Sequence, residues 1–434
     1  MAYETEEARR LVIEAGLRLQ SEGLIVRTWG NISARISDTQ FVITPSGKAY
    51  ETLTPEDIVI VNIKKCTYEG DIKPSSECGI HADVYAMRPE VNFVIHTHQA
   101  YASAVSILGQ DIELSEDEKP FLGDRIPCAE YGMSSSPKLR KKVKGVLKKS
   151  QGCSSMLLRN HGVLCMGTDY DNAFEISSVM EQVCKYQYEK KTLAFAGIDI
   201  ERERIIREET KPAEDGVELL VDESVEGYED NPQMDAWFEA DESDMNAGGF
   251  VDYGTSRIEG NEITLTLGDK EYKYELGDKK PVSKGLFRRG ANKIALIHSK
   301  IYEDRAVSCI YHVTLPNIVD MSKKTKGFVP YIDDQAQIVG DYLKCIGKIG
   351  KKPRIESASA IAKAIKGNNA VLIAGQGALC AGMSEGDLEA TAYVLEKGCM
   401  AAKLALCNSE AECVPKKTAK KEREFYVNTY SKLK

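Results

Sequence analysis

The chain has 434 residues, of which 42% are hydrophobic and 28% are charged, and its formal net charge is −9. This length allows two ordinary domains, each with its own core. No run of about 18 apolar residues is present, and the N-terminus MAYETEEARR is charged where a signal peptide would be apolar. We therefore expect a cytoplasmic protein that does not insert into a membrane.

The negative charge also argues against nucleic-acid binding, because phosphate backbones repel it. One basic stretch, residues 138–149, has apolar residues at helical spacing, so we interpret it as a helix with a solvated face. The twelve cysteines are spread from Cys66 to Cys413 and never form a Cys-x-x-Cys pair. They are expected to be reduced thiols, as is usual for a large cytosolic chain.

The first half of the chain alternates between predicted helices and strands. A helix with apolar residues on one face ends near Gly23, which suits a left-handed cap. Ser75 or Ser76 is expected to cap a second helix, which Pro89 ends. Further strands are predicted at 41–44, 57–61, 91–96, 154–158 and 162–167, and further helices at 99–108 and 173–194. This order predicts an α/β domain with a central sheet covered by helices.

An acidic stretch with scattered Pro and Gly separates the two halves. It changes the composition of the chain without any sustained hydrophobic period, which is typical of a linker. We place the first domain at residues 1–205, the linker at 206–245 and the second domain at 246–434.

The two halves resemble each other at a displacement of 215 positions. In the segments RNHGVLCMG and AGQGALCAG, and in the helices that follow, six positions are identical; the first copy carries Gly162, Leu164, Cys165, Gly167, Glu181 and Cys184. After small gaps, His81 matches His298 and His96 matches His312. A similarity between NISARI and GTSRIE is weak. The chain is therefore predicted to be a tandem repeat.

Three histidines of the first half have the pattern of a catalytic metal site. His96 and His98 are alternate residues at the end of a strand, so both side chains can face one ion. His161 follows in an Arg-Asn-His-Gly turn, where Gly162 permits a sharp bend. Three protein ligands leave a position open for substrate. The spacing alone leaves open that these are surface or core histidines.

The second copy has lost most of this pattern, since Thr314 stands opposite His98 and Gln376 opposite His161. One remaining imidazole with a threonine and an amide is a poor zinc site. We infer that only the first half retains the metal site. His81, which recurs as His298, is expected to be mainly structural, and Ile294 stands opposite Glu77.

Five motifs of the first half resemble the class II aldolase/adducin family, which includes L-fuculose-phosphate aldolase and L-ribulose-phosphate 4-epimerase. They are GNIS at 30–33, TPSG at 44–47, PSSE at 74–77, HTH at 96–98 and NHG at 160–162. The resemblance implies two tandem domains, each with a mostly antiparallel sheet, and a homo-oligomer in which a dimer of chains imitates the family's fourfold ring. The second half would then line part of the first half's site, or contribute a side chain to it.

The resemblance also implies a set of site residues. It implies that His96, His98 and His161 bind Zn²⁺, or another divalent ion such as Mn²⁺ or Co²⁺, and that Glu77 is the catalytic acid/base. Asn31, Ser46, Gly47, Ser75 and Ser76 would hold the substrate phosphate. The implied reaction is cleavage or formation of a carbon–carbon bond in a small sugar phosphate such as one yielding dihydroxyacetone phosphate, through a metal-stabilised enediolate.

Other interpretations remain open. An epimerase, dehydratase or decarboxylase could use the same site; Glu77 in place of the epimerases' aspartate favours cleavage, whereas Trp29 in TWGNIS is closer to the epimerases. For the residue that a neighbouring subunit contributes in this family, the candidates are Asp117, Glu118 and Asp124. Ordinary turn and capping roles would also explain the serines and Glu77. The chain could instead be an adducin-like scaffold, or its second half could bind a regulatory ligand.

Overall fold

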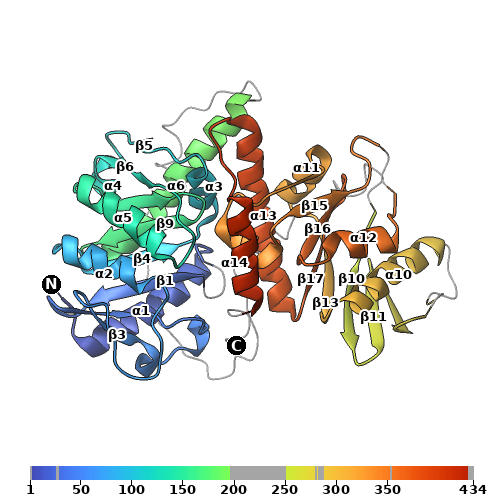
Figure 1. The fold of residues 1–434 in the computed structure, drawn as a ribbon, viewed down its shortest axis with the longest axis horizontal. Coiled ribbons are helices and arrows are strands. Elements are labelled where there is room, and N and C mark those ends of the chain that lie inside the picture. The colour runs from blue at the N-terminus through green and yellow to red at the C-terminus, as the bar shows by residue number, and fades with distance from the viewer. Residues whose placement is uncertain are drawn as a thin grey trace, which may run out of the picture.

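The computed structural model describes residues 2–25, 29–195, 251–278, 281, 288–351 and 354–428. Two α/β domains lie side by side in this part of the chain (Figure 1). The predicted linker, residues 206–245, lies outside the described residues. None of the described helices is both long and apolar enough to span a membrane.

The first domain is built on a seven-stranded sheet. In spatial order its strands are β3 (Val59–Asn62), β2 (Gln40–Ile43), β1 (Gly30–Arg35), β4 (Phe93–Thr97), β9 (Gly162–Gly167), β8 (Ser155–Leu158) and β7 (Cys128–Ala129). All neighbouring pairs are antiparallel except β7 and β8, which run parallel. The prediction of a mostly antiparallel central sheet is confirmed.

Helices cover both faces of this sheet. One face packs against α1 (Thr5–Ser21), α3 (Ala100–Ser106) and α6 (Tyr170–Phe195), and the other against α2 (Cys78–Met87) and α5 (Pro137–Lys149). Successive strand residues alternate between the two cores, as Val94 and Ile95 do, because strand side chains point to opposite faces. The smaller elements are η1 (Tyr50–Thr52), η2 (Pro55–Asp57), β5 (Ile112–Glu113), α4 (Lys119–Leu122) and β6 (Arg125–Ile126).

The second domain repeats this strand order and adds one strand at an edge. Its strands are β12 (Lys270–Glu275), β11 (Glu262–Leu267), β10 (Thr255–Glu259), β13 (Cys309–Val313), β17 (Gly377–Gly382), β16 (Ala370–Ile373), β15 (Leu343–Ile346) and β14 (Gly327–Phe328). Its helices are α10 (Arg288–Asp304), α11 (Pro316–Lys324), the π-helix η4 (Gln335–Val339), α12 (Ala358–Ile365), α13 (Glu385–Cys407) and α14 (Lys416–Asn428). The parallel pair also recurs, as β15 and β16.

The strand register agrees with the sequence alignment of the two halves. His96 pairs with Leu164, and His312 pairs with Leu379, so the match of His96 to His312 agrees with that of Leu164 to Leu379. The weak similarity between NISARI and GTSRIE also marks a true correspondence. In each domain a buried serine hydroxyl on the first strand lies 2.6 Å from a histidine Nδ1 and 2.8 Å from a tyrosine hydroxyl. The members are Ser33, His81 and Tyr85, and Ser256, His298 and Tyr302.

The repeated glutamates Glu181 and Glu396 have the same structural task. Each carboxylate accepts hydrogen bonds from backbone N–H groups at the start of a neighbouring helix, α3 in the first domain and α11 in the second. These N–H groups have no partner within their own helix, so an outside acceptor stabilises the helix end. Burial raises the pKa of Glu181 to about 7.

The predicted cap of α2 is wrong. The helix begins at Cys78 and Glu77 occupies the N-cap position without a capping side-chain hydrogen bond. The Ser75 hydroxyl instead accepts a hydrogen bond from the Glu77 N–H at 3.3 Å, and the Cys78 N–H donates to the Ser75 carbonyl. A turn thus precedes the helix and leaves the Glu77 side chain free for other contacts.

The two domains share an apolar interface. Helix α13 of the second domain packs against α3 and α6 of the first. Met400, Ala401 and Leu404 from α13 belong to the same buried cluster as the first domain's helices. Lys397 is completely buried at this interface, next to the candidate site described below.

Candidate metal centre

The three predicted histidines lie together. Nε2 of His96 is 3.1 Å from Nε2 of His161 and 3.3 Å from Nε2 of His98. Within the described part of the chain, they are the group of His, Cys, Asp or Glu side chains spaced to hold a metal ion, with ligand atoms within 4.8 Å of one another. His96 and His161 are each only 2% exposed.

The turn between β8 and β9 places His161 beside the end of β4. Asn160 adopts a left-handed conformation with φ of 60°, and the His161 N–H bonds to the Leu158 carbonyl. A Cβ atom on Gly162 would lie 2.3 Å from the Thr97 carbonyl oxygen. Only glycine allows this close approach, which brings the NHG turn next to the HTH segment.

The other ring nitrogen of each histidine faces an oxygen acceptor. Nδ1 of His96 donates to the Val163 carbonyl at 2.8 Å, and Nδ1 of His161 donates to Asp333 Oδ2 at 3.2 Å. Nδ1 of His98 lies 3.5 Å from Asp334 Oδ2. These contacts leave all three Nε2 atoms facing one point, which is how ligating histidines are oriented in metal sites.

Glu77 faces the same point from the N-terminus of α2. Its Oε2 is 3.1 Å from His96 Nε2, and its Oε1 is 3.4 Å from His161 Nε2. Ser135 N–H donates to Oε1 at 3.1 Å, and Asn31 Nδ2 donates to Oε2 at 3.3 Å. Burial raises the pKa of Glu77, but the neighbouring His161 and His96 lower it well below its ordinary value.

His81 has a further contact that its counterpart lacks. Its Nε2 lies 2.5 Å from Asn31 Oδ1, so His81 orients the amide that donates to Glu77. In the second domain, Nε2 of His298 bonds to the backbone carbonyl of Tyr253 instead. Burial lowers the pKa of His81 to about 3, which keeps the ring neutral. His81 thus combines the predicted structural role with a contact to the candidate site.

The pKa values of His98 and His161 are shifted in opposite directions. Burial lowers the pKa of His98 to about 3. Burial also acts to lower the pKa of His161, but the charges of Glu77 and Asp333 outweigh it and raise this pKa to about 10. Without a bound metal, both ring nitrogens of His161 are therefore protonated at neutral pH, and the ring is positively charged.

A cavity of about 80 Å³ opens beside this cluster. All five residues predicted to hold phosphate line it, together with Glu77, His98 and His161. The remaining lining residues are Trp29, Gly30, Pro45, Ser134, Ser135, Gln337 and Phe425. Ser134 and Ser135 carried no signal in the sequence, and Gln337 and Phe425 belong to the second domain.

The second domain reaches the site through the segment between α11 and β15. Its counterpart in the first domain is the segment between α3 and β7, residues 107–127, where the sequence offered Asp117, Glu118 and Asp124 as candidates. Among the described residues of one chain, Asp333 and Asp334 are the acidic residues that the second domain places beside the histidines. A contribution of Asp117, Glu118 or Asp124 from a neighbouring subunit stays a prediction. Glu118 caps its own turn by accepting from the Ser115 N–H at 2.7 Å.

Hydrogen bonds lock this segment onto the first domain. Asn160 Nδ2 donates to the carbonyls of Tyr331 and Glu412 at 2.7 and 2.6 Å, and Asp333 N–H donates to the Asn160 carbonyl at 2.8 Å. The Tyr131 hydroxyl donates to Asp333 Oδ1 at 2.8 Å. The Asp333 carboxylate is thus held between His161 and Tyr131.

Asp334 is held by a buried cation. Lys397 Nζ forms an ion pair with Asp334 and donates a hydrogen bond to the His98 carbonyl at 2.8 Å. Burial raises the pKa of Asp334, but Lys397 and His98 lower it to about 2. The side chain of one α13 lysine therefore links the second domain to the backbone of the HTH segment.

The matching place in the second domain has different chemistry. His312 Nε2 donates to the Gln376 carbonyl at 2.5 Å, and its Nδ1 accepts from the Tyr253 N–H at 3.2 Å. Both ring nitrogens of His312 are therefore engaged by the backbone. This agrees with the inference that the second copy has no comparable histidine cluster among its described residues.

Comparison with known proteins identifies the family. The model of the class II aldolase and adducin N-terminal domain matches residues 10–188 and 272–402, and the chain belongs to this family. It is 30% identical over 190 residues to a 5-deoxy-D-ribulose 1-phosphate aldolase of Bacillus thuringiensis, covering 43% of this chain and 87% of the relative. It is 37% identical over 171 residues to a 5-methylthioribulose-1-phosphate/5-deoxyribulose-1-phosphate aldolase of Escherichia coli, covering 39% and 78%.

Solved structures of family members also match. An L-fuculose 1-phosphate aldolase structure is 26% identical, with coverage of 46% of this chain and 93% of that chain and a TM-score of 0.40. The match of the family model to both halves of the chain confirms the resemblance inferred from the five motifs.

Proposed function

We propose that this chain is a divalent-metal-dependent aldolase that cleaves and forms a carbon–carbon bond in a small ketose phosphate. The observation that carries the proposal is the convergence of three imidazole Nε2 atoms on one point, with the Glu77 carboxylate 3.1 to 3.4 Å from two of them. Three nitrogen ligands and a nearby carboxylate suit Zn²⁺, and Mn²⁺ or Co²⁺ can use the same set.

His96, His98 and His161 would hold the ion. When bound, it would polarise the neighbouring carbonyl and hydroxyl oxygens of the substrate and stabilise the negative charge that develops as the carbon–carbon bond breaks. The hydrogen bonds on the Nδ1 atoms of His96 and His161 keep their rings oriented for this role. Because one acceptor is Asp333, the second domain takes part in building the site.

Glu77 would move the proton at the reacting carbon. In cleavage, the C3–C4 bond breaks, the C4 hydroxyl loses its proton to become an aldehyde, and C3 gains a proton. Glu77 would deliver a proton to C3 and would remove it in the reverse direction. Its contacts to Asn31 and Ser135 fix the carboxylate in this position.

The substrate phosphate would bind at the far wall of the cavity. Ser46, Ser75 and Ser76 supply hydroxyl groups there, and Gly47 supplies a backbone N–H. Asn31 adds an amide at the junction with Glu77. Such donors bind phosphate without a lysine, since each N–H or O–H donates to a phosphate oxygen.

Two aromatic residues favour a substrate with an apolar end. Trp29 of the first domain and Phe425 of α14 both line the cavity. They provide apolar surface where a sugar chain would extend away from the ion. This supports ketose 1-phosphates that lack a terminal hydroxyl, such as the 5-deoxyribulose phosphate for which two relatives are named.

The test combines metal analysis with a substrate panel. The purified chain is expected to bind close to one equivalent of metal, and His98→Ala to bind much less. Cleavage of 5-deoxyribulose, ribulose and fuculose 1-phosphates, assayed with Zn²⁺, Mn²⁺ or Co²⁺, should release dihydroxyacetone phosphate. NMR of the products separates cleavage from epimerisation or dehydration. A chain that binds no metal, or a panel without cleavage, would contradict the proposal and favour the scaffold or the other reactions.

We propose further that two chains form the ring of four domains that the family uses. Light scattering on the purified protein is expected to give twice the chain mass of 48.0 kDa. A monomer with full activity would argue against this assembly. The measurement is independent of the metal analysis.

A further inference from the structure

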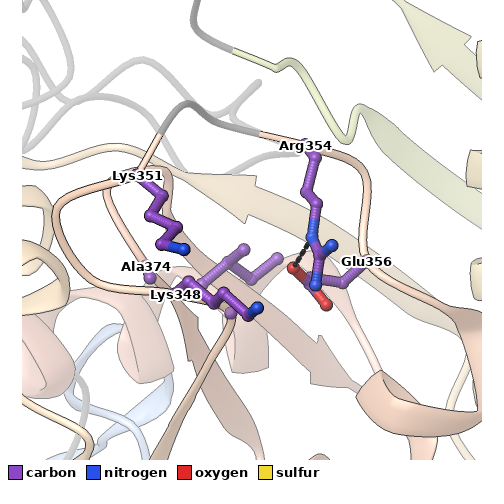
Figure 2. A pocket seen from close by; sticks show the side chains of 7 residues that line it. Lys348, Lys351, Arg354, Glu356 and Ala374 are labelled. Atoms are coloured by element: carbon purple, nitrogen blue, oxygen red, sulfur yellow. Dashed lines mark hydrogen bonds and ion pairs between the residues drawn. The ribbon is translucent and has the colours of Figure 1, made fainter.

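The second domain has a cavity of its own, whose lining shares no residue with the cavity beside the histidine cluster. It has a volume of about 330 Å³ and lies where β15 and β16 end (Figure 2). Its lining residues are Gly347, Lys348, Lys351, Arg354, Glu356, Ile373 and Ala374. Pockets that bind small molecules begin at about this size.

The position of this cavity follows from the repeat. In both domains a short strand runs parallel to its neighbour, β7 to β8 and β15 to β16. A loop leads from the end of that strand to a helix whose N-cap is a serine, Ser136 for α5 and Ser357 for α12. In the first domain this loop carries Ser134 and Ser135 into the candidate substrate cavity. The second domain thus has a pocket beside the corresponding loop, with a different lining.

Most of the charged residues that line the second domain's cavity are cationic. Figure 2 shows the side chains of Lys348, Lys351 and Arg354 extending from one loop, with their nitrogen ends around the same space. The single carboxylate, Glu356, bonds to Arg354 Nε at 3.1 Å. Three cations and one anion leave an excess of two positive charges, in a chain whose formal net charge is −9. This local excess of positive charge attracts anions into the pocket, although the chain as a whole is negatively charged.

The backbone around the pocket is closely packed. Gly347 has φ of 95°, and a Cβ atom there would lie 3.3 Å from Ala374 Cβ and 3.3 Å from Glu356 Oε1. The Ala374 N–H bonds to the Ile346 carbonyl at 2.8 Å, which ties the two strand ends together. The side chain of Glu356 is only 13% exposed. These contacts fix the base of the pocket, whereas the side chains of Lys348, Lys351 and Arg354 around it are exposed.

We infer that this pocket binds a small phosphorylated metabolite through its phosphate group, at a site separate from the metal centre. A phosphate monoester carries about 1.5 to 2 negative charges at neutral pH, which matches the excess charge of the lining. The planar guanidinium of Arg354 can donate two parallel hydrogen bonds to phosphate oxygens, while the lysines act as flexible point charges. The volume beyond the phosphate leaves room for a short carbon chain.

Equilibrium dialysis of the full chain with ³²P-labelled inorganic phosphate in 0.15 M KCl tests the site, since this salt already screens weak surface attraction. The double variant K348A/K351A is expected to lose one equivalent of bound phosphate, or to bind it at least tenfold more weakly. Arg354→Lys keeps the positive charge but loses the planar guanidinium with its two parallel hydrogen bonds. It should weaken phosphate binding less than Arg354→Ala.

The matched control is K363A/K366A, which removes two exposed lysines of the same domain outside this pocket. It is expected to bind phosphate like the unchanged chain. Identical isotherms for K348A/K351A and the unchanged chain would overturn the inference. The comparison does not depend on the metal centre: if the first domain binds no phosphate, the unchanged chain should bind one equivalent and K348A/K351A none.

Discussion

Asp333 accepts a hydrogen bond from Nδ1 of His161 at 3.2 Å, although the two residues are 172 positions apart in the chain. One belongs to the second domain and the other to the first domain's NHG turn. Both side chains are at most 2% exposed. The contact joins the candidate metal centre to a domain that has lost the corresponding residues itself.

Replacing Asp333 with Asn tests this contact. The amide oxygen can still accept from His161 Nδ1 but carries no negative charge, so the ring loses part of its basicity. We expect the metal affinity, corrected for the proton that the ion displaces from His161, to fall about 10- to 100-fold, as is typical when the group behind a ligating histidine is changed. Competition with a chromophoric chelator measures the dissociation constant directly.

The matched control for that experiment is Asp269→Asn, at an exposed turn of the second domain. It removes the same charge far from the cluster and should leave the metal dissociation constant unchanged. An Asp333→Asn chain that binds metal as tightly as this control would show that the second domain does not support the site.

Glu77→Gln should separate proton transfer from metal binding. The three imidazoles remain, so about one equivalent of metal should still bind, whereas kcat for cleavage should fall by about 10² or more, because a positioned acid/base contributes this much. Glu69→Gln, an exposed residue of the same domain, is the control and should keep its full kcat. If kcat survives in Glu77→Gln, another group moves the proton.

Metal binding should release a proton from His161. The pKa of His161 is raised to about 10, since Glu77 and Asp333 outweigh the effect of burial, so the ring is protonated between pH 7 and 9 without metal. The ion needs the deprotonated nitrogen. His98, with a pKa lowered to about 3, releases none in this range. Affinity should therefore rise about tenfold per pH unit up to about pH 10.

Calorimetry in buffers of different ionisation enthalpy counts the protons released. Close to one proton per metal at pH 8 is the expected result. A metal affinity independent of pH between 7 and 9 would mean that His161 is neutral in the metal-free chain.

Removing one partner of the buried pair Lys397 and Asp334 should strongly destabilise the chain. Lys397→Met leaves the Asp334 carboxylate buried beside His98 without its cation. Breaking a buried pair on one side costs about 3–5 kcal/mol. The urea unfolding midpoint of metal-free Lys397→Met should fall accordingly. The double variant K397M/D334N should lose less free energy of unfolding than the sum of the losses in the two single variants.

Lys403 on the same helix provides the comparison. It pairs with Asp320 at 3.1 Å, and its side chain is 33% exposed. Lys403→Met should change the free energy of unfolding by about 1 kcal/mol or less, because exposed pairs contribute little. Equal midpoints for Lys397→Met and Lys403→Met would contradict a special role for the buried pair.

The prediction of the helix cap before α2 failed for a local reason. Ser75 is a suitable capping residue, but its hydroxyl bonds to the Glu77 N–H inside a turn, and the helix starts later. Capping propensity identified Ser75 as a residue of this turn. The hydrogen bond from the Cys78 N–H to the Ser75 carbonyl, however, set the first residue of the helix. Helix ends are decided by such competing hydrogen bonds.

The sequence by itself determined the tandem α/β architecture and the meeting of His96, His98 and His161. The tandem architecture follows from the internal repeat, and the histidines were found from the HTH and NHG motifs. In the structure the pairing of β4 with β9 brings His161 beside His96, and glycine allows the bend after His161. Only the tertiary structure decided that Asp333 and Asp334 would stand behind two of the histidines and that Phe425 would line the cavity. Their positions depend on how α13 packs on α3 and α6, and no periodicity within either segment encodes contacts between residues so far apart.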